Sequence, residues 1–370
     1  MGDTGVTDGR RRRRAFIGSF TTAGGPGIVT ADLGPDGALT VLSTVNGLPD
    51  PSCLALSPDG RTLYAVSETA EGSVAAFRLP GAGNRAAGDA GDTPEQAGPA
   101  VPVHGNGPTH LCLFAGHVLT ANYGSGSVTA VPVRADGSLA RSASGVFPHT
   151  GPAAHPHRRR PHAHQVQPDP SGRWAVAVDL GTDSVRVYTL ADGTPAPHSE
   201  TALRAGSGPR HLAFHPDGTR AYLLHELSPT LTVCRWDTAG GTLRPLAEIP
   251  VLPGVPSGDA YPSGVAVSPD GRFVWTATRG EDVLSVFAVA DRPDGGDGAA
   301  GTDGTPGLRL ITTVPCGGHW PRALVESHGF LYVANERSGD VTWFAVDPDT
   351  GTPRRRGSIP VTAASCVVVG

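Results

Sequence analysis

Residues 53–79 read CLALSPDGRTLYAVSETAEGSVAAFRL, and this stretch decides the fold. It consists of an apolar strand, a tight turn at Ser57–Arg61, a second strand that ends near Glu68, a short polar link and a third strand. Pro-Asp-Gly suits the turn because Pro pre-sets φ, Asp bonds back to the chain and Gly accepts a positive φ. The pattern therefore predicts consecutive antiparallel strands joined by short loops.

The same block recurs along the chain. Equivalent turns occur at residues 215–218 and 268–271, and a fourth strand often follows a Gly-x-Leu signal, as at residues 137–139. The first strands of the repeats begin near residues 53, 110, 163, 211, 264, 322 and 365. Four strands in each repeat of about fifty residues are typical of a β-propeller blade. We therefore predict an all-β, seven-bladed β-propeller rather than an open solenoid or two sandwich domains.

The two ends of the chain complement each other. The last predicted first strand, Ser365–Val369, has no second strand after it, whereas the N-terminal region offers strands at Ala15–Phe20, Gly27–Leu33 and Leu39–Val45 without a first strand. Pairing the two ends completes one blade and leaves only short edges exposed. We therefore expect the N- and C-terminal strands to close the ring in one shared blade.

The domain organisation follows from this count. Residues 15–370 are expected to form one propeller domain, and residues 1–14 a disordered basic tail. The insertions Pro80–Ala100 and Asp291–Gly307 are rich in Gly, Ala, Asp and Pro, and they are expected to be flexible surface loops. Arg10–Arg14 is similar to a twin-arginine export signal, but no continuous apolar stretch follows. We expect a cytoplasmic protein, with export as the alternative.

Composition excludes several classes of function. The formal net charge of -5 offers no basic field for nucleic acid, and no apolar run has the length of a membrane span. The chain contains no lysine, so neither a lysine Schiff base nor a P-loop lysine is available. The 5 cysteines are scattered without C-x-x-C spacing, which argues against a disulfide framework or a zinc site. We expect a monomer or a weak homodimer that needs no cofactor.

Polar residues gather at one end of the blades. The first strand is innermost in a propeller and the second runs antiparallel to it, so the start of one and the end of the other meet at the same mouth of the ring. Candidate residues at these two places are His110, His162, His164, Arg210, His211, Arg322, Glu68, Asn122, Asp179, Glu226, Arg279 and Asn335. Clustered charges in a partly enclosed site are costly unless they are paired or used.

Two alternatives to a catalytic site remain open at these positions. The side chains could join neighbouring blades by hydrogen bonds, above all Asn122, Asp179 and Asn335, whose loops use such side chains to cap turns. His162 and His164 alternate on a strand and could face the same side, but a metal site would need further ligands. We therefore expect no metal.

At these residues the chain resembles the bacterial lactonase family of seven-bladed propellers, whose type member is a 6-phosphogluconolactonase. The resemblance spans Ala15 to Val369 and rests on a set of short motifs. They are PHAHQV (161–166), DLGTD (179–183), GPRHL (208–212), HEL (225–227), RG (279–280) and NYGSG (122–126). One departure is His225, where the family usually has Asn before the glutamate, and Ser67 stands at the same place before Glu68.

The resemblance implies an activity and roles. The related fungal carboxy-muconate lactonizing propellers have a proposed catalytic His, Arg and Glu, which match His162 or His164, Arg210 and Glu226. The implied reaction is hydrolysis of a sugar lactone, foremost 6-phosphogluconolactone of the pentose phosphate pathway. Glu226 or a histidine would be the general base, and Arg210 with Arg279 would hold an oxyanion or a phosphate. The remaining candidates would bind substrate.

Two other functions stay open beside this one. The first is a related activity, either hydrolysis of another sugar lactone or a muconate-type cycloisomerisation. The second is a propeller that serves as a binding scaffold without catalysis. A scaffold would more often expose apolar residues at the mouth than converging charges.

Overall fold

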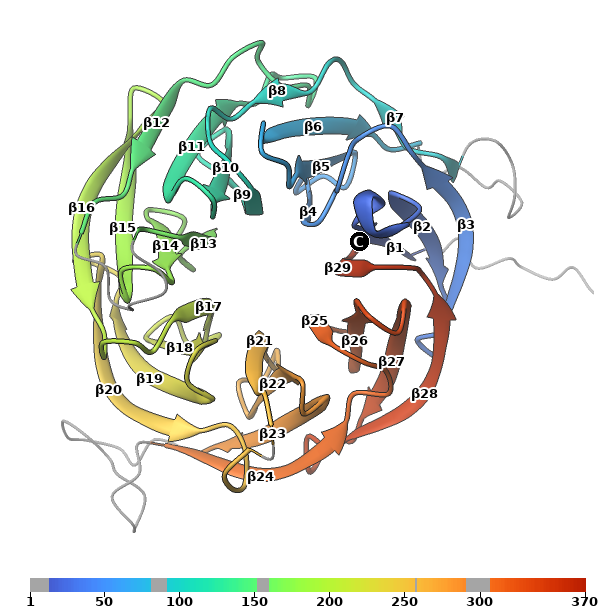
Figure 1. The fold of residues 1–370 in the computed structure, drawn as a ribbon, viewed down its shortest axis with the longest axis vertical. Coiled ribbons are helices and arrows are strands. Elements are labelled where there is room, and N and C mark those ends of the chain that lie inside the picture. Colours follow the sequence, from blue (N-terminus) through green and yellow to red (C-terminus); the bar gives the residue numbers. More distant parts are fainter. Residues whose placement is uncertain (1–12, 81–91, 152–159, 257, 291–306) are drawn as a thin grey trace, which may run out of the picture.

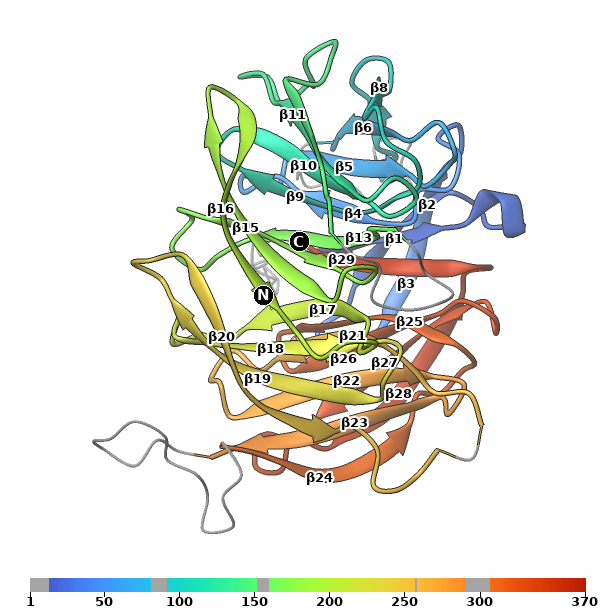
Figure 2. The same cartoon turned by 60° about the vertical axis from the view of Figure 1, so that its left-hand side comes forward.

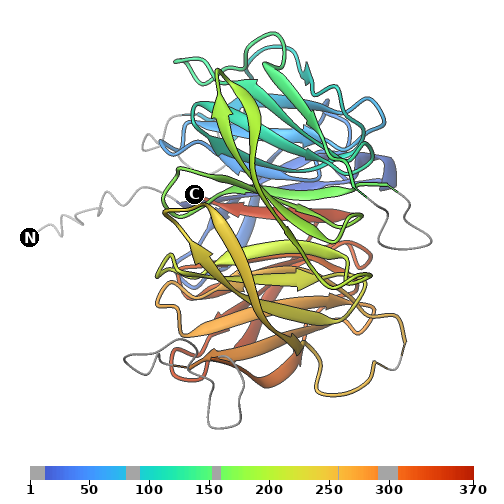
Figure 3. The ribbon, with the colours of Figure 1, turned by 90° about the vertical axis from the view of Figure 1, so that its left-hand side faces the viewer.

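The repeat folds as expected into seven antiparallel sheets around a central axis (Figure 1). The structure is a computed structural model and describes residues 13–80, 92–151, 160–256, 258–290 and 307–370. Each blade has its first strand nearest the axis and its last strand on the outside, and the side views of Figures 2 and 3 show β16 and β20 crossing the outer surface. No helix among the described residues is long and apolar enough to span a membrane.

The strands of blades 1 to 3 follow one another along the chain. Blade 1 contains β4 (Leu54–Leu56), β5 (Thr62–Ser67), β6 (Ser73–Arg78) and the short outer strands β7 (Glu95–Gln96) and β8 (Val101–Pro102). Blade 2 contains β9 (Pro108–Phe114), β10 (His117–Asn122), β11 (Ser127–Pro132) and β12 (Gly145–Pro148). Blade 3 contains β13 (Ala163–Pro168), β14 (Ala175–Asp179), β15 (Ser184–Ala191) and β16 (Thr194–Ala202).

Blades 4 to 6 repeat the same order. Blade 4 contains β17 (Pro209–Phe214), β18 (Arg220–His225), β19 (Thr230–Asp237) and β20 (Thr242–Pro250). Blade 5 contains β21 (Tyr261–Val267), β22 (Phe273–Arg279), β23 (Val283–Val289) and β24 (Leu308–Pro315). Blade 6 contains β25 (Pro321–Ser327), β26 (Phe330–Asn335), β27 (Asp340–Val346) and β28 (Pro353–Pro360).

Blade 7 joins the two ends of the chain, as predicted. It contains β29 (Ala364–Val369), β1 (Arg13–Ser19), β2 (Ile28–Leu33) and β3 (Leu39–Val45), and a 3₁₀ turn (Thr21–Ala23) follows β1. The C-terminal strand is innermost and pairs antiparallel with β1 through Ala15↔Val369 and Ile17↔Val367.

Two segments differ from the sequence expectation. β1 begins at Arg13, two residues before the expected start of the propeller at Ala15, because Arg13 and Arg14 continue the ladder opposite Leu33 and Asp32. In the insertion expected to be a flexible loop at Pro80–Ala100, β7 pairs with β6, and the buried Asp92 forms an ion pair with Arg14. Residues 1–12, 81–91 and 291–306 lie outside the described part, so the expectations for the tail and for both loops are not tested there.

The core is divided among the blade boundaries. Seven clusters of buried apolar side chains each lie between two neighbouring sheets, including one between blades 6 and 7 and one between blades 7 and 1. The Gly-x-Leu signal belongs to these boundaries. Gly137 has a φ of +82° and its carbonyl accepts a hydrogen bond from Tyr64 of the preceding blade, while Leu139 is buried in the cluster between those blades. The signal therefore marks a turn between the third and fourth strands of one blade that packs against the preceding blade.

Candidate active site

The first strand of each blade carries a β-bulge where it starts. The register shifts by one residue between Pro209 and His211 of β17, and shifts of the same kind occur in β9, β13, β21, β25 and β29. The bulged residues are Thr109, His164, Arg210, Ser263, Arg322 and Ser365. In blade 1 the bonds from Val66 N to Cys53 O and from Glu68 N to Asp50 O place Ser52 at the same position. Bulges re-aim side chains, so one residue of each blade is set apart from the ladder.

The second strand of a blade adds one more residue to this face, the residue directly after its last paired position. Its backbone N–H bonds back to the segment before the first strand, as from Glu226 to the Gly208 carbonyl and from Glu336 to the Trp320 carbonyl. The residues at this position are Phe20, Glu68, Tyr123, Leu180, Glu226 and Glu336. In blade 5 the register places Arg279 at the equivalent position, opposite Tyr261. We call these residues, together with the bulged residues, the inner rim.

One ion group of the inner rim centres on Glu226. Its Oε2 lies 3.1 Å from Nε of Arg210 and 3.0 Å from Nη2 of Arg279, and all three side chains are largely buried. Arg210 also donates to the backbone carbonyl of Ser263 in the next blade. Burial, with a contribution from Arg279, lowers the pKa of Arg210 to about 9 despite the opposing effect of Glu226. A cation held in this way is well suited to stabilising an oxyanion.

A second ion group centres on Arg322. Its guanidinium lies 3.6 Å from Oε1 of Glu68 and 3.2 Å from Oε2 of Glu336, with Cζ 4.7 Å from the centroid of the Phe20 ring. Burial alone would lower the pKa of Arg322, but Glu68 and Glu336 outweigh it and raise the pKa. The two ion groups act on each other, because Arg210 opposes the rise that burial causes in the pKa of Glu68, and Glu226 contributes to raising the pKa of Arg322.

Three histidines adjoin Arg210. The ring centroids of His164 and His211 are 5.2 Å apart, those of His110 and His211 are 5.7 Å apart, and both pairs meet edge to face. Nε2 of His211 lies 3.3 Å from Nη1 of Arg210. Burial and then Arg210 lower the pKa of all three, for His110 to about 4, so each is held in its neutral form at pH 7.

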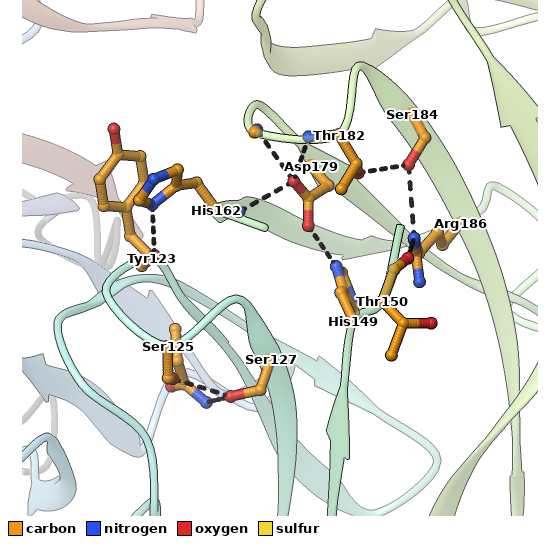
Figure 4. A network of polar contacts seen from close by, with 12 residues as sticks. Tyr123, Ser125, Ser127, His149, Thr150, His162, Asp179, Thr182, Ser184 and Arg186 are labelled. Atoms are coloured by element: carbon orange, nitrogen blue, oxygen red, sulfur yellow. Dashed lines mark hydrogen bonds and ion pairs between the residues drawn. The ribbon is translucent and has the colours of Figure 1, made fainter. Parts of the chain in front are cut away.

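His162 lies beside this cluster, next to Tyr123. Its ring stacks on Tyr123 at 4.4 Å, and its Nδ1 donates to the Tyr123 carbonyl at 2.9 Å (Figure 4). The ring of His164 meets the same tyrosine edge to face at 5.6 Å. Both histidines are therefore close to one aromatic ring, but His164 is the one that packs against His211.

Three expected binding residues are engaged elsewhere. The Asn122 amide donates to Ser127 and Thr129, and Asn335 makes the same kind of bond to Thr342. Asp179 accepts from the backbone N–H groups of His162, Gly181 and Thr182 and from Nδ1 of His149 at 2.5 Å (Figure 4). These residues are the last of their strands, one position before the inner rim, so their side chains cap loops within and between blades.

Sequence reasoning missed three residues of this face. Tyr123 and Glu336 stand one position after the end of a second strand, as Glu68 and Glu226 do. An alignment of the second strands at this position would have identified Tyr123 and Glu336 from the sequence. Trp320 has a φ of +66°, which is rare for a bulky residue, and Asp282 holds its backbone N–H at 2.8 Å. Its ring centroid lies 5.6 Å from Cζ of Arg279 and 3.3 Å from Cζ of Arg337. No sequence signal marks that conformation.

The inner rim and its neighbours therefore bring arginines, carboxylates and neutral imidazoles together on one face of the ring. Among the described residues no group of three or more His, Cys, Asp or Glu side chains is placed to hold a metal ion. Fixed arginines can stabilise a developing oxyanion. A neighbouring carboxylate or neutral imidazole can accept and return a proton.

A family model described as "Lactonase, 7-bladed beta-propeller" matches residues 14–369. The chain belongs to this lactonase family. Among its relatives is the 6-phosphogluconolactonase of Bacillus subtilis, with 31% identity over 91% of this lactonase and 92% of the relative. The periplasmic gluconolactonase PpgL of Pseudomonas aeruginosa superposes with a TM-score of 0.84 at 30% identity, covering 96% of this lactonase and 98% of that protein. A protein from Lactobacillus plantarum gives a TM-score of 0.83 at 28% identity, with coverages of 97% and 99%.

Proposed function

We propose that this lactonase hydrolyses a sugar lactone, and that the substrate is 6-phosphoglucono-1,5-lactone in the cytoplasmic pentose phosphate pathway. The observation that carries the proposal is the ion group of Arg210, Glu226 and Arg279, which lies beside the three neutral histidines. The name of the Bacillus subtilis relative supports the phosphorylated substrate, and the name of the Pseudomonas aeruginosa neighbour supports an unphosphorylated sugar lactone.

Hydrolysis requires water to attack the lactone carbonyl carbon while negative charge develops on the carbonyl oxygen. Arg210 and Arg279 would hold that oxygen, and their fixed, largely buried positions make the interaction stronger than it would be in water. Glu226 keeps the two guanidinium groups together, because both contact the same carboxylate oxygen. His164 and His211 remain neutral and can donate or accept hydrogen bonds to the hydroxyl groups of the sugar.

A direct assay tests the proposal. Purified protein is given freshly prepared 6-phosphogluconolactone or gluconolactone, and acid release is followed at constant pH with spontaneous hydrolysis subtracted. We expect turnover of both, with the higher kcat/KM for the phosphorylated lactone. A preference for the unphosphorylated lactone would redirect the substrate assignment, and turnover of neither would refute the lactonase proposal.

A further inference from the structure

The inner rim holds three glutamates, and they differ in what their oxygens already contact. Oε2 of Glu226 lies within 3.1 Å of two arginines, and Oε2 of Glu336 accepts from Nη1 of Arg322 at 3.2 Å. Glu68 forms a longer ion pair, with its Oε1 3.6 Å from Nη2 of Arg322. Its Oε2 is buried and has no hydrogen-bond partner among the described residues. Of the three carboxylates, Glu68 therefore has an oxygen available for a new partner.

The surroundings of Glu68 favour proton transfer. Burial raises the pKa of its carboxyl, and the nearby Glu336 adds to the rise, while Arg322, the Ser52 hydroxyl and Arg210 oppose it. Cys53, at the start of the same blade, is also close enough for the charge of Glu68 to act on its thiol. A carboxylate whose pKa lies above the ordinary value is a stronger base. Glu226, in contrast, already contacts two arginines at 3.1 and 3.0 Å.

We propose that Glu68 is the general base of the lactonase reaction, facing a carbonyl oxygen held by Arg210 and Arg279. The assignment rests on the proposed function. The water oxygen bonds to the carbonyl carbon as its proton passes to Glu68 and the carbonyl electron pair moves to the oxygen. The C=O bond then re-forms, the bond from the carbonyl carbon to the ring oxygen breaks, and the departing oxygen takes the proton back from Glu68. The product is the open hydroxy acid, which ionises in solution.

The position of Glu68 relative to the other ion group supports this division of roles. Glu68 and Glu226 occupy the same place in blades 1 and 4, and Arg210 of the Glu226 group acts on the charge of Glu68. The base and the oxyanion-binding cations therefore come from separate blades on one face of the ring. This separation leaves the Glu226 carboxylate to orient the arginines, rather than to accept the proton.

Substitution at position 68 is the first test. Glu68→Gln should lower kcat for lactone hydrolysis by about 10²- to 10⁴-fold with little change in KM, and the acid limb of the pH–rate profile should disappear. Glu68→Ala with added formate should regain part of the lost turnover, because formate can replace the missing carboxylate. Glu326→Gln is the matched control, because burial also raises the pKa of Glu326, whose Oε1 caps Gly329 in the turn after β25. Its kcat should stay within twofold of wild type.

A second test leaves position 68 intact. Glu336→Gln removes a negative charge that raises the pKa of Glu68, so the acid limb of the wild-type profile should move to lower pH. A folded Glu68→Gln variant with near wild-type kcat would overturn the assignment, and so would an acid limb that Glu336→Gln leaves unmoved. A wild-type protein without lactonase turnover would instead refute the proposed function. The two failures are therefore distinguishable.

Discussion

Nε of Arg210 lies 3.1 Å from Oε2 of Glu226, and the same oxygen lies 3.0 Å from Nη2 of Arg279. One carboxylate oxygen therefore sets the spacing of two guanidinium groups that come from blades 4 and 5. Without that charge, two buried cations would repel each other, as the lowering of the pKa of Arg210 by Arg279 shows.

This relationship predicts the effect of Glu226→Gln. The variant should fold, because its side chain keeps the shape of glutamate, but the arginines should separate and kcat should fall by about a hundredfold or more. Steady-state kinetics with a thermal melt as control would check this. If the variant only lowered the melting temperature and kept full turnover, Glu226 would be a structural link between blades and not part of the reaction.

The C-terminal strand should be indispensable for folding. Deleting Ser365–Gly370 removes most of β29, including Val367 from the cluster between blades 6 and 7 and Cys366 from the cluster between blades 7 and 1. We expect loss of the cooperative thermal transition of the full-length chain. Deleting Met1–Gly9 is the control and should leave that transition unchanged. A truncated protein that melted like the full-length chain would contradict closure through β29.

The insertion in blade 1 should tolerate shortening only up to Asp92. We expect removal of residues 81–91 to change stability little, whereas Asp92→Ala removes the partner of the partly buried Arg14. We expect Asp92→Ala to lower the free energy of unfolding by about 1–3 kcal/mol, as for a lost buried charge partner. Urea titration of both variants measures the difference. An Asp92→Ala variant as stable as wild type would show that the ion pair does not help to hold β1.

Asp179 should make stability depend on pH. Burial raises the pKa of Asp179, but the hydrogen bond and charge of His149 and the backbone N–H groups outweigh it and lower the pKa below 3.8. The ionised form is thus favoured in the folded state, and its contribution is present above pH 3.8 and is lost as the pH falls through the folded-state pKa. Asp179→Asn should cost about 3 kcal/mol at pH 7.

Urea unfolding at several pH values tests this prediction. The difference in unfolding free energy between wild type and Asp179→Asn should shrink as the pH falls from 3.8 through the folded-state pKa, because the unfolded chain binds the proton first and the folded carboxylate binds it only at lower pH. A difference that stayed constant down to acid pH would mean that the charge of Asp179 contributes nothing.

The sequence was sufficient for the blade count and for ring closure, because both depend on local turn chemistry and alternating strands. It also placed Arg210, Glu226 and Arg279 on one face, since the antiparallel order of strands requires it. It could not separate Asn122 from Tyr123 or Asn335 from Glu336, because neighbouring residues at a strand end point in different directions and the bulges shift the register. The left-handed backbone of Trp320 depends on Asp282, 38 residues earlier in the chain, and so leaves no local signal.

The bulges have a consequence for how such proteins diversify. Each blade presents one residue outside the ladder, and the seven apolar clusters lie between the sheets, away from these positions. An exchange at one bulge, such as Arg322 for a different polar residue, would alter the chemistry of the shared face, and the bulged position lies outside the strand ladder. Selection can therefore change the preferred lactone through single exchanges at the bulged positions, while the strand pairing of all seven blades is kept.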